Sequence, residues 1–449
     1  MTEGASVVWL RDDLRLADNP ALMAAIDRGA PLVVLYVLDE VSDGVRALGG
    51  ASKWWLHNSL ERLRESLGGA LTVREGVVSI VLPEVVAEVG ADAVYWNRRY
   101  SNDRELDAAL KASLRTSGIE VRSFQAALLF EPWTVTTGEG NPYKVFTPFW
   151  RACLERGVSR APLEAPGLDT FDPLELRSDE LDLLPRKPDW AGGLRETWTP
   201  GEQGARDTLE RFASDGLADY HLRDQPGVEA TSHLSPYLKF GEISPFQIYH
   251  RIEHGPLSGA ARANAAKFLS ELGWREFNAS ILFYFPELAT KNYRSAFDAF
   301  VWSSEFDIEL RAWQQGRTGI PLVDAGMREL WHTGYMHNRV RMVTASFLIK
   351  NLLIDWRVGE RWFWDTLVDA DEASNAANWQ WVAGSGADAA PYFRVFNPVL
   401  QQQKFDPHGD YVRRWLPEWG TPDYPEPIVD LKASRAGALA AYEAVRLGG

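Results

Sequence analysis

The sequence predicts two domains of different class: an N-terminal α/β domain with a doubly wound parallel sheet, and an all-α C-terminal domain. Three observations predict this. The chain has 449 residues, more than one hydrophobic core usually supports. Up to residue 124, short β-rich apolar runs alternate with helical patterns, as in parallel α/β folds. From Gly201 onward the hydrophobic periodicity is helical.

The α/β domain is expected over residues 1–130. Residues 32–38 form a continuous apolar run, as in a strand covered on both faces. The other expected strands are residues 6–9, 70–74, 93–96 and 120–124, and the expected helices are residues 19–28, 52–67, 79–89 and 103–116. No G-x-G-x-x-G follows the first strand and no P-loop is present, so the usual nucleotide fingerprints are missing.

Residues 131–200 are expected to form a connector over the surface, because prolines punctuate them and acidic residues cluster at 178–182. The helical domain is expected over residues 201–449. Its clearest helical patterns are residues 205–213, 245–253, 260–283, 320–333 and 338–353. Ser244 followed by Pro245 is typical of an N-cap with proline at the first helical position.

Composition indicates a globular, cytoplasmic protein. Hydrophobic residues make up 45% and charged residues 24% of the chain. No apolar run reaches the roughly 18 residues of a membrane-spanning helix, and the first six residues do not resemble a secretory signal. The single cysteine, Cys153, excludes a disulfide framework and a cysteine-rich metal site, and we expect no bound metal.

The formal net charge of −15 argues against broad contact with nucleic-acid phosphates. Residues 327–350 are an exception that predicts a small basic groove. Their charged residues are Arg328, Arg339, Arg341 and Lys350 against Glu329 alone. A protein of this kind would bind DNA with modest general affinity and would depend on a specific pocket.

Tryptophan is unusually frequent, with 19 in the chain and eight between Trp302 and Trp381. A rich helical core accounts for most of them. Clustered indoles also suit a stacking site or a chain of electron carriers. The motifs of hydrolases and metal sites, H-E-x-x-H, G-x-S-x-G and C-x-x-C, are absent, but four other clusters could carry chemistry.

The first cluster is a run of hydroxyl residues before a helical pattern. Thr231, Ser232 and Ser235 lie within five residues of one another. Hydroxyls and free N–H groups at the start of a helix suit a diphosphate. The alternative is an ordinary N-cap and turn.

The second cluster places a carboxyl, an indole and a guanidinium on one helix face. Glu271, Trp274 and Arg275 lie at positions i, i+3 and i+4. Together they could bind a base by hydrogen bonding and stacking. The alternative is a surface ion pair beside a half-buried tryptophan.

The third cluster spans residues 336–342. Asn338 and Met342 share a helix face, whereas Arg339 points elsewhere. An amide can bind a base edge and an arginine can bind a phosphate. The alternative is a helix start with solvated charges.

The fourth cluster spans residues 369–381. Asn375 and Trp379 share a helix face, whereas Trp379 and Trp381 are about 200° apart around a helix axis. The two indoles should therefore contact different partners. The alternative is that both tryptophans only pack in a core.

These clusters stand in segments that resemble the DNA photolyase/cryptochrome family over nearly the whole chain. The opening residues 8–19, V-W-L-R-D-D-L-R-L-A-D-N, are similar to its first strand and turn. The other similar segments are residues 274–277, 318–325, 336–339, 378–381 and 391–398. The resemblance implies an α/β domain for an antenna chromophore and a helical domain that holds a U-shaped FAD.

The resemblance also assigns roles near the flavin. Residues matching the diphosphate-binding turn are Thr231, Ser232, Leu234 and Ser235, with Tyr220 close by. Asp369 and Arg341 match an ion pair beside the isoalloxazine, and Asp371 matches a residue that contacts the ring. Asn375 matches the residue that faces flavin N5.

Further matches concern electron transfer and DNA. Trp379, Trp356 and Trp302 match the indole chain that carries an electron from the surface to the flavin. Residues matching the pocket for the flipped dimer are Glu271, Trp274, Asn338, Met342 and Trp381. Residues matching positions near the DNA backbone are Arg223, Arg339 and Arg394.

The activity implied by the resemblance is light-driven repair of cyclobutane pyrimidine dimers in DNA. Reduced FAD passes an electron to a flipped-out dimer, and flipping a dimer costs less than flipping a stacked base. We expect a monomer with FAD and an antenna chromophore, methenyltetrahydrofolate in preference to deazaflavin. Ala377 and Asn378, residues 277–280 and residues 55–60 favour the class III branch over class I.

Three alternatives are weaker. A cryptochrome photosensor without repair would carry aspartate at Asn375 and a long C-terminal tail, whereas this chain ends at Gly449. A (6-4) photoproduct enzyme would carry histidine at Asn338. A simple flavoprotein oxidoreductase would need a nicotinamide site, for which the sequence has no motif.

Overall fold

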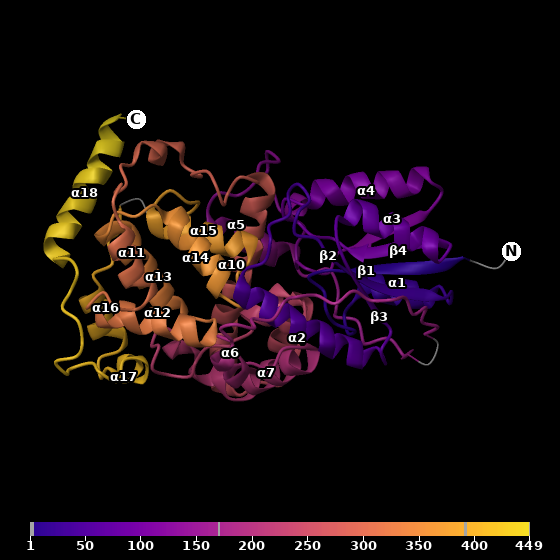
Figure 1. The fold of residues 1–449 in the computed structure, drawn as a ribbon, viewed down its shortest axis with the longest axis horizontal. Coiled ribbons are helices and arrows are strands. Elements are labelled where there is room, and N and C mark those ends of the chain that lie inside the picture. The colour runs from indigo at the N-terminus through magenta and orange to yellow at the C-terminus, as the bar shows by residue number, and fades with distance from the viewer. Residues whose placement is uncertain (1–3, 169–170, 390–392, 449) are drawn as a thin grey trace.

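The computed structural model describes residues 4–168, 171–389 and 393–448. A strand-containing part and a helical part lie side by side along the long axis of the molecule (Figure 1). The N-terminus lies at the outer end of the first part, and the C-terminal helix lies at the opposite end of the second. This is the predicted combination of an α/β domain and a helical domain.

The sheet has five parallel strands in the order β3-β2-β1-β4-β5. The strands are β1 (Ala5–Leu10), β2 (Leu32–Leu38), β3 (Leu71–Glu75), β4 (Ala91–Asn97) and β5 (Glu120–Phe124). β2 has the predicted bounds, and every residue in it is buried. Its continuous apolar sequence is explained because helices cover both faces of the sheet.

Side chains alternate between the two faces of the sheet. Val7 and Trp9 point toward α3 (Val78–Glu88) and α4 (Arg104–Thr116). The helices on the other face are α1 (Pro20–Asp27) and α2 (Gly50–Ser66). On that face the sheet core continues without a break into the helical part. Trp55 of α2 is fully buried there, so the two domains share one core.

The helical part is built around the 26-residue helix α10 (Gly259–Tyr284), which packs against α15 (Glu372–Ala383). The longer helices around this pair are α7 (Glu202–Ser214), α9 (Pro245–His254), α11 (Asp307–Gln314), α12 (Pro321–Thr333), α13 (Asn338–Ser346), α14 (Trp356–Thr366) and α18 (Leu431–Gly448). The shorter helices are α6 (Gly192–Thr197), α8 (Ser235–Lys239), α16 (Pro398–Phe405) and α17 (Asp410–Trp415). Ser244 caps α9 in a capping box with Pro245 at its start, as predicted.

The expected connector is more ordered than proline spacing suggested. It contains α5 (Phe146–Arg156), whose residues Phe149, Trp150 and Cys153 are buried in the shared core. Farther along, Asp179 N–H donates to the Val73 carbonyl, which lengthens the pairing at the β3 edge. The segment therefore packs on both domains, and the division at residues 131–200 stays a prediction.

The expected helix over residues 338–353 is interrupted. α13 ends at Ser346, and a wide π-helical turn, η5 (Phe347–Asn351), follows it. Lys350 in this turn is buried, and its ammonium lies 4.2 Å from the ring centroid of Phe393. Such turns arise where packing inserts one extra residue into a helix, a change that hydrophobic periodicity does not report.

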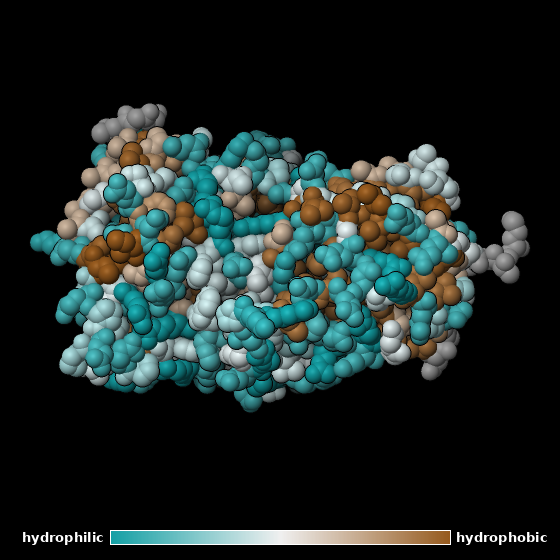
Figure 2. Space-filling model, viewed as in Figure 1, coloured by the Kyte–Doolittle hydropathy of each residue, from teal (hydrophilic) through white to brown (hydrophobic). Residues whose placement is uncertain are grey.

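Hydrophilic side chains cover much of the face shown in Figure 2, and hydrophobic residues gather over the α/β part. No helix among the described residues is long and apolar enough to cross a membrane. The same residues contain no group of three or more His, Cys, Asp or Glu side chains placed to hold a metal ion.

Candidate flavin and dimer site

A cavity of about 470 Å³ opens in the helical domain between α10, α13 and α15, in the size range of small-molecule sites. It brings together half of the site residues predicted from the sequence. Those that line it are Ser235, Glu271, Trp274, Asn338, Arg341, Met342, Asp369, Asn375, Trp379 and Trp381. Segments more than 100 residues apart in the chain thus meet at one place.

An ion pair between the half-buried Arg341 and the buried Asp369 forms one wall of the cavity. Arg341 Nη2 donates to Asp369 Oδ2 at 2.8 Å, and Ser235 Oγ donates to the same oxygen at 2.6 Å. Burial opposes the charge of Arg341, but the Asp369 carboxylate raises the pKa of the guanidinium above its usual value. Asp369 Oδ1 is buried and has no hydrogen-bond partner among the described residues, so it can accept from a bound group.

Asn375 lines the same cavity and is hydrogen-bonded to Glu360 of α14. Its Nδ2 donates to the Glu360 carbonyl at 3.0 Å and to Glu360 Oε1 at 2.9 Å. Both protons of the amide are therefore engaged, and Oδ1 is the acceptor left for the cavity. Glu360 is 1% exposed, and no sequence motif marked it as part of the site.

The three tryptophans of the predicted electron chain differ in exposure. Trp379 lines the cavity and is 3% exposed, with Phe363 and Trp313 packed against it. Trp356 is completely buried and donates from Nε1 to Asn292 Oδ1 at 2.9 Å. Trp302 is half-buried. Of the three, Trp302 alone is partly exposed, as expected of the surface end of an electron path.

The α10 cluster keeps the predicted common face. Glu271, Trp274 and Arg275 all line the cavity. The Glu271 carboxylate pairs with Lys267 one turn earlier, and Arg275 of the cluster instead donates to the Ala127 carbonyl at 2.8 Å. The ring of Phe146, a residue that the sequence analysis did not single out, stacks on Trp274 with ring centroids 3.9 Å apart.

The opposite wall comes from α13 and α15. Asn338 and Met342 face the cavity, and Arg339 points away, as predicted. Trp381 lines the cavity and donates from Nε1 to the Asp388 carbonyl at 3.1 Å. Trp379 and Trp381 thus have different partners.

Comparison with known proteins shows the family of this chain. Residues 6–167 match the family model described as DNA photolyase, and residues 268–421 match the FAD binding domain of DNA photolyase. A deoxyribodipyrimidine photo-lyase of Agrobacterium fabrum is 48% identical, over 98% of each chain. The chain belongs to the DNA photolyase family. Cryptochrome-1 of Arabidopsis thaliana is 37% identical over 96% of this photolyase family member and 69% of the plant protein.

A solved photolyase structure agrees with this placement. The crystal structure of a bacterial class III photolyase from Agrobacterium tumefaciens matches with a TM-score of 0.93 at 47% identity. It covers 99% of this chain and 98% of that chain. This similar solved photolyase is a class III enzyme, which is the branch that the sequence favoured.

The cavity of this photolyase family member fits a flavin. Asp369 Oδ1 and Asn375 Oδ1 are acceptors for which the described residues provide no donor. A ring with N–H donors would satisfy both. Tyr335 also lines the cavity, and burial raises its pKa to about 12, so it remains a neutral donor. The FAD binding domain match includes these three residues.

Several predicted flavin contacts do not line this cavity. Ser235 begins α8 and reaches it, whereas Thr231, Ser232 and Leu234 lie in the preceding turn. In that turn His233 has a left-handed backbone, with φ of 53°. Tyr220 is buried between Phe212 and Phe268. Their contacts with a diphosphate stay predictions.

Asp371 is also outside the cavity. Its Oδ1 accepts from Ser374 N–H at 2.7 Å and caps α15. It lines a separate cavity of about 80 Å³ between the domains, together with Arg99 and Lys239. The structure does not bring Asp371 together with Asn375 at the large cavity, and its predicted ring contact stays untested.

The basic groove predicted from residues 327–350 is wrong, because tertiary contacts pair or bury its cations. Arg328 pairs with Glu418 at 2.5 Å, Arg339 with Asp224 at 2.9 Å, and Arg341 with Asp369, while Lys350 is buried. Of the other predicted DNA contacts, Arg394 is exposed and Arg223 lies 5.5 Å from the Tyr220 ring centroid. Pro391 and Tyr392 of the motif before Arg394 lie outside the described residues.

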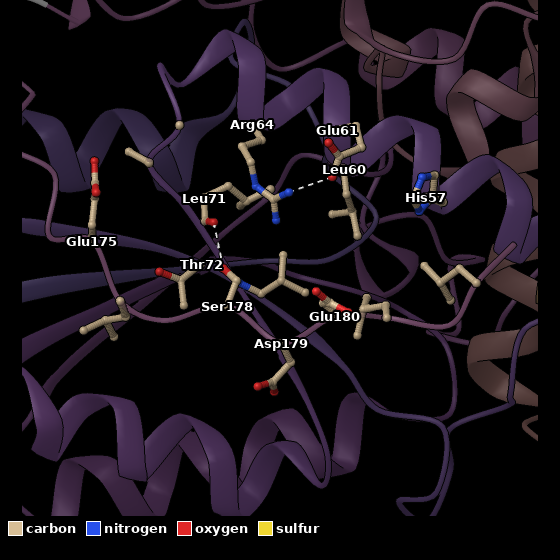
Figure 3. A pocket seen from close by; sticks show the side chains of 16 residues that line it. His57, Leu60, Glu61, Arg64, Leu71, Thr72, Glu175, Ser178, Asp179 and Glu180 are labelled. Carbon is tan, nitrogen blue, oxygen red and sulfur yellow. Dashed lines mark hydrogen bonds and ion pairs between the residues drawn. The ribbon is translucent and has the colours of Figure 1, made fainter.

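A second cleft, of about 450 Å³, lies on the α/β domain between α2, β3 and residues 175–183 (Figure 3). Arg64 there is tied to Glu61 at 2.6 Å, and Ser178 Oγ contacts the Leu71 carbonyl. Its remaining charged walls include Glu175, Asp179 and Glu180. This predominantly acidic lining disfavours the binding of phosphate groups in the cleft.

Proposed function

We propose that this protein is a cyclobutane pyrimidine dimer photolyase, a lyase that repairs DNA in the light. The observation that carries the proposal is that one cavity holds both sets of side chains. Asp369, Arg341 and Asn375 form a polar cluster suited to a flavin, and Glu271 and Trp274 face them across the same space. FAD, when bound, supplies the light-excited electron that opens the dimer.

The protein residues supply position and electrostatics. The Arg341–Asp369 pair presents a half-buried guanidinium beside a carboxylate oxygen with spare acceptor capacity. Trp274 and Trp381 offer indole faces for an extruded dimer. Asn338 offers an amide for base edges, and Glu271 would hydrogen-bond a base of the dimer.

The proposed partner is DNA that contains cyclobutane pyrimidine dimers, bound by the protein as a monomer. Arg223, Arg339 and Arg394 would contact phosphates, Arg339 after releasing Asp224. Thr231, Ser232, Leu234 and Tyr220 would hold the remainder of FAD. The proposed antenna is methenyltetrahydrofolate, with deazaflavin as the alternative.

A photosensor without repair is the main alternative, since cryptochromes share this fold. Asn375 with its oxygen facing the cavity favours repair. The deciding experiment is illumination of purified, flavin-reduced protein with an oligonucleotide that carries one dimer. Loss of the dimer in light and not in darkness supports photolyase activity, and bound FAD without repair supports the photosensor. Protein that releases no flavin on denaturation contradicts both.

A further inference from the structure

The flavin side of the cavity is tied to the α/β domain through one arginine. Arg46 lies in the loop between β2 and α2 and reaches α14 of the helical domain. Its Nη1 and Nη2 donate to Glu360 Oε1 and Oε2 at 2.6 and 2.9 Å. The Glu360 side chain is 2% exposed and that of Arg46 is 27% exposed. Such a two-point pair fixes the plane of the carboxylate as well as its charge.

The loop that carries Arg46 is itself held against α14. The guanidinium carbon of Arg46 lies 3.9 Å from the ring centroid of Trp364, and Trp364 Nε1 donates to the Ala47 carbonyl at 2.8 Å. A Cβ on Gly49 would lie 2.2 Å from the Trp364 carbonyl oxygen, so the loop backbone lies directly on the helix. Arg46 therefore has little freedom to leave Glu360.

Glu360 in turn determines which way the Asn375 amide points. Both groups of Glu360 that contact Asn375, the carbonyl and Oε1, are acceptors. The reverse amide orientation would place Asn375 Oδ1 against two acceptors, which is unfavourable. Arg46 Nη1 donates to the same Oε1, which holds this oxygen as an acceptor beside the amide.

We propose that Arg46 is a positioning residue for the flavin: it holds the Glu360 carboxylate in place as an acceptor, which fixes the Asn375 amide with Oδ1 toward the cavity. This inference rests on the proposed function, because it requires FAD in that cavity. The α/β domain then acts on the flavin chemistry of the helical domain through residues 314 positions apart in sequence.

Removing the cation should loosen this arrangement. Without Arg46, the Glu360 carboxylate loses the two hydrogen bonds that fix its plane and is left as a buried charge without its cation, which is unfavourable. Oε1 can then turn away from Asn375 Nδ2, so the amide can rotate and present its N–H₂ group to the cavity. The reduced flavin, which carries a proton at N5, then loses an acceptor, and reduction becomes less favourable.

The test is the midpoint potential of FAD bound to the full-length protein. Loss of one hydrogen bond to the reduced form predicts about a tenfold fall in the reduction equilibrium for Arg46→Gln, which is about 30 mV for a two-electron couple. Arg46→Lys keeps a cation and should restore most of this shift. The matched control is Arg64→Gln, which breaks the Arg64–Glu61 ion pair of α2 and should leave the potential unchanged.

A double-variant cycle distinguishes positioning from a general structural effect. In an Asn375→Ala background, Arg46→Gln should add no shift, because the amide that it positions is gone. An equal shift in both backgrounds, or no shift in Arg46→Gln that holds FAD, overturns the proposal.

If Arg46→Gln folds too poorly to hold FAD, Arg46→Lys replaces it in the test. The carbonyl band of isotope-labelled asparagine is then measured in infrared difference spectra together with the midpoint potential. The proposal is supported if Arg46→Lys leaves the asparagine band and the midpoint potential unchanged while Glu360→Gln shifts both. If Glu360→Gln also leaves the band and the potential unchanged, the proposal is overturned. Unaltered protein that binds no FAD contradicts the proposed function instead.

Discussion

The ring of Phe146 lies parallel to the indole of Trp274, with ring centroids 3.9 Å apart and an angle of 10° between the planes. Phe146 N–H donates to Asp388 Oδ2 at 3.4 Å, and the Asp388 carbonyl accepts from Trp381 Nε1 at 3.1 Å. The two tryptophans proposed to hold the dimer are therefore linked through Phe146 and Asp388.

Phe146→Leu should weaken binding of dimer-containing DNA about two- to tenfold, because a stacked aromatic pair contributes roughly 0.5–1.5 kcal/mol. Binding of intact DNA should not change. The measurement is a binding titration with both DNAs. Trp133→Leu is the control, since Trp133 packs against Phe283 and does not line the cavity. Equal weakening on both DNAs would show that Phe146 only stabilises the fold.

Trp379→Phe should abolish reduction of oxidised FAD by external donors in the light. Repair by chemically pre-reduced protein should persist, because the repair electron passes directly from flavin to dimer. Both rates are measured by absorbance under illumination. Trp362→Phe, which alters an indole stacked on the exposed Trp331, should affect neither. Pre-reduced Trp379→Phe protein that binds the dimer but cannot repair it would contradict the separate roles of Trp379 and Trp381.

Arg339→Ala should weaken binding to damaged and intact DNA alike and lower the salt dependence by about one unit, as expected of a phosphate contact. In the free protein Arg339 pairs with Asp224, which competes with phosphate for the guanidinium. Asp224→Ala should therefore strengthen binding to both damaged and intact DNA. Titrations at several salt concentrations measure these effects. If Asp224→Ala leaves both affinities unchanged, Arg339 does not exchange its partner for phosphate.

Trp381→Ala should cost roughly 1–3 kcal/mol of binding on dimer-containing DNA, the usual contribution of base stacking on an aromatic ring. Intact DNA should bind almost as before, and the salt dependence should stay the same. The same titrations measure both. Equal losses on the two DNAs would make Trp381 a core tryptophan outside the dimer pocket.

Stability should fall in mild acid partly because of His337. Burial lowers the pKa of His337 to about 4 from an ordinary value of 6.5. Since the unfolded chain binds the proton more readily, this contribution is complete above pH 6.5 and is lost as the pH falls toward 4. Protonated Nδ1 could no longer accept from Arg339 N–H at 3.2 Å, where it caps α13.

His337→Asn keeps a capping side chain without a titrating group. Thermal unfolding between pH 7 and pH 5 should therefore vary less with pH than in the unaltered protein. His250→Asn, at an exposed position of α9, should retain the original pH dependence. An unchanged slope in His337→Asn would show that other groups control the acid transition.

Local patterns predicted much of this molecule correctly. Periodicity predicted the strand at residues 32–38 and the helix at 260–283, and the structure agrees within one residue at each end. It also predicted that Arg339 points away from Asn338 and Met342, as the structure shows. Periodicity failed for α5, because the prolines on either side suggested a surface connector. It also failed at η5, because a single inserted residue leaves the apolar pattern almost unchanged.

The order of strands and helices, and which side chains share a helix face, follow from the amino-acid sequence alone, since both depend on neighbours within a few residues. Which cations remain available, and what holds the site together, depend on contacts made in the folded protein. Arg339 pairs with Asp224, Phe146 covers Trp274, and Arg46 reaches Glu360. These contacts join segments more than 100 residues apart, and their formation depends on how helices pack, which no local spacing encodes.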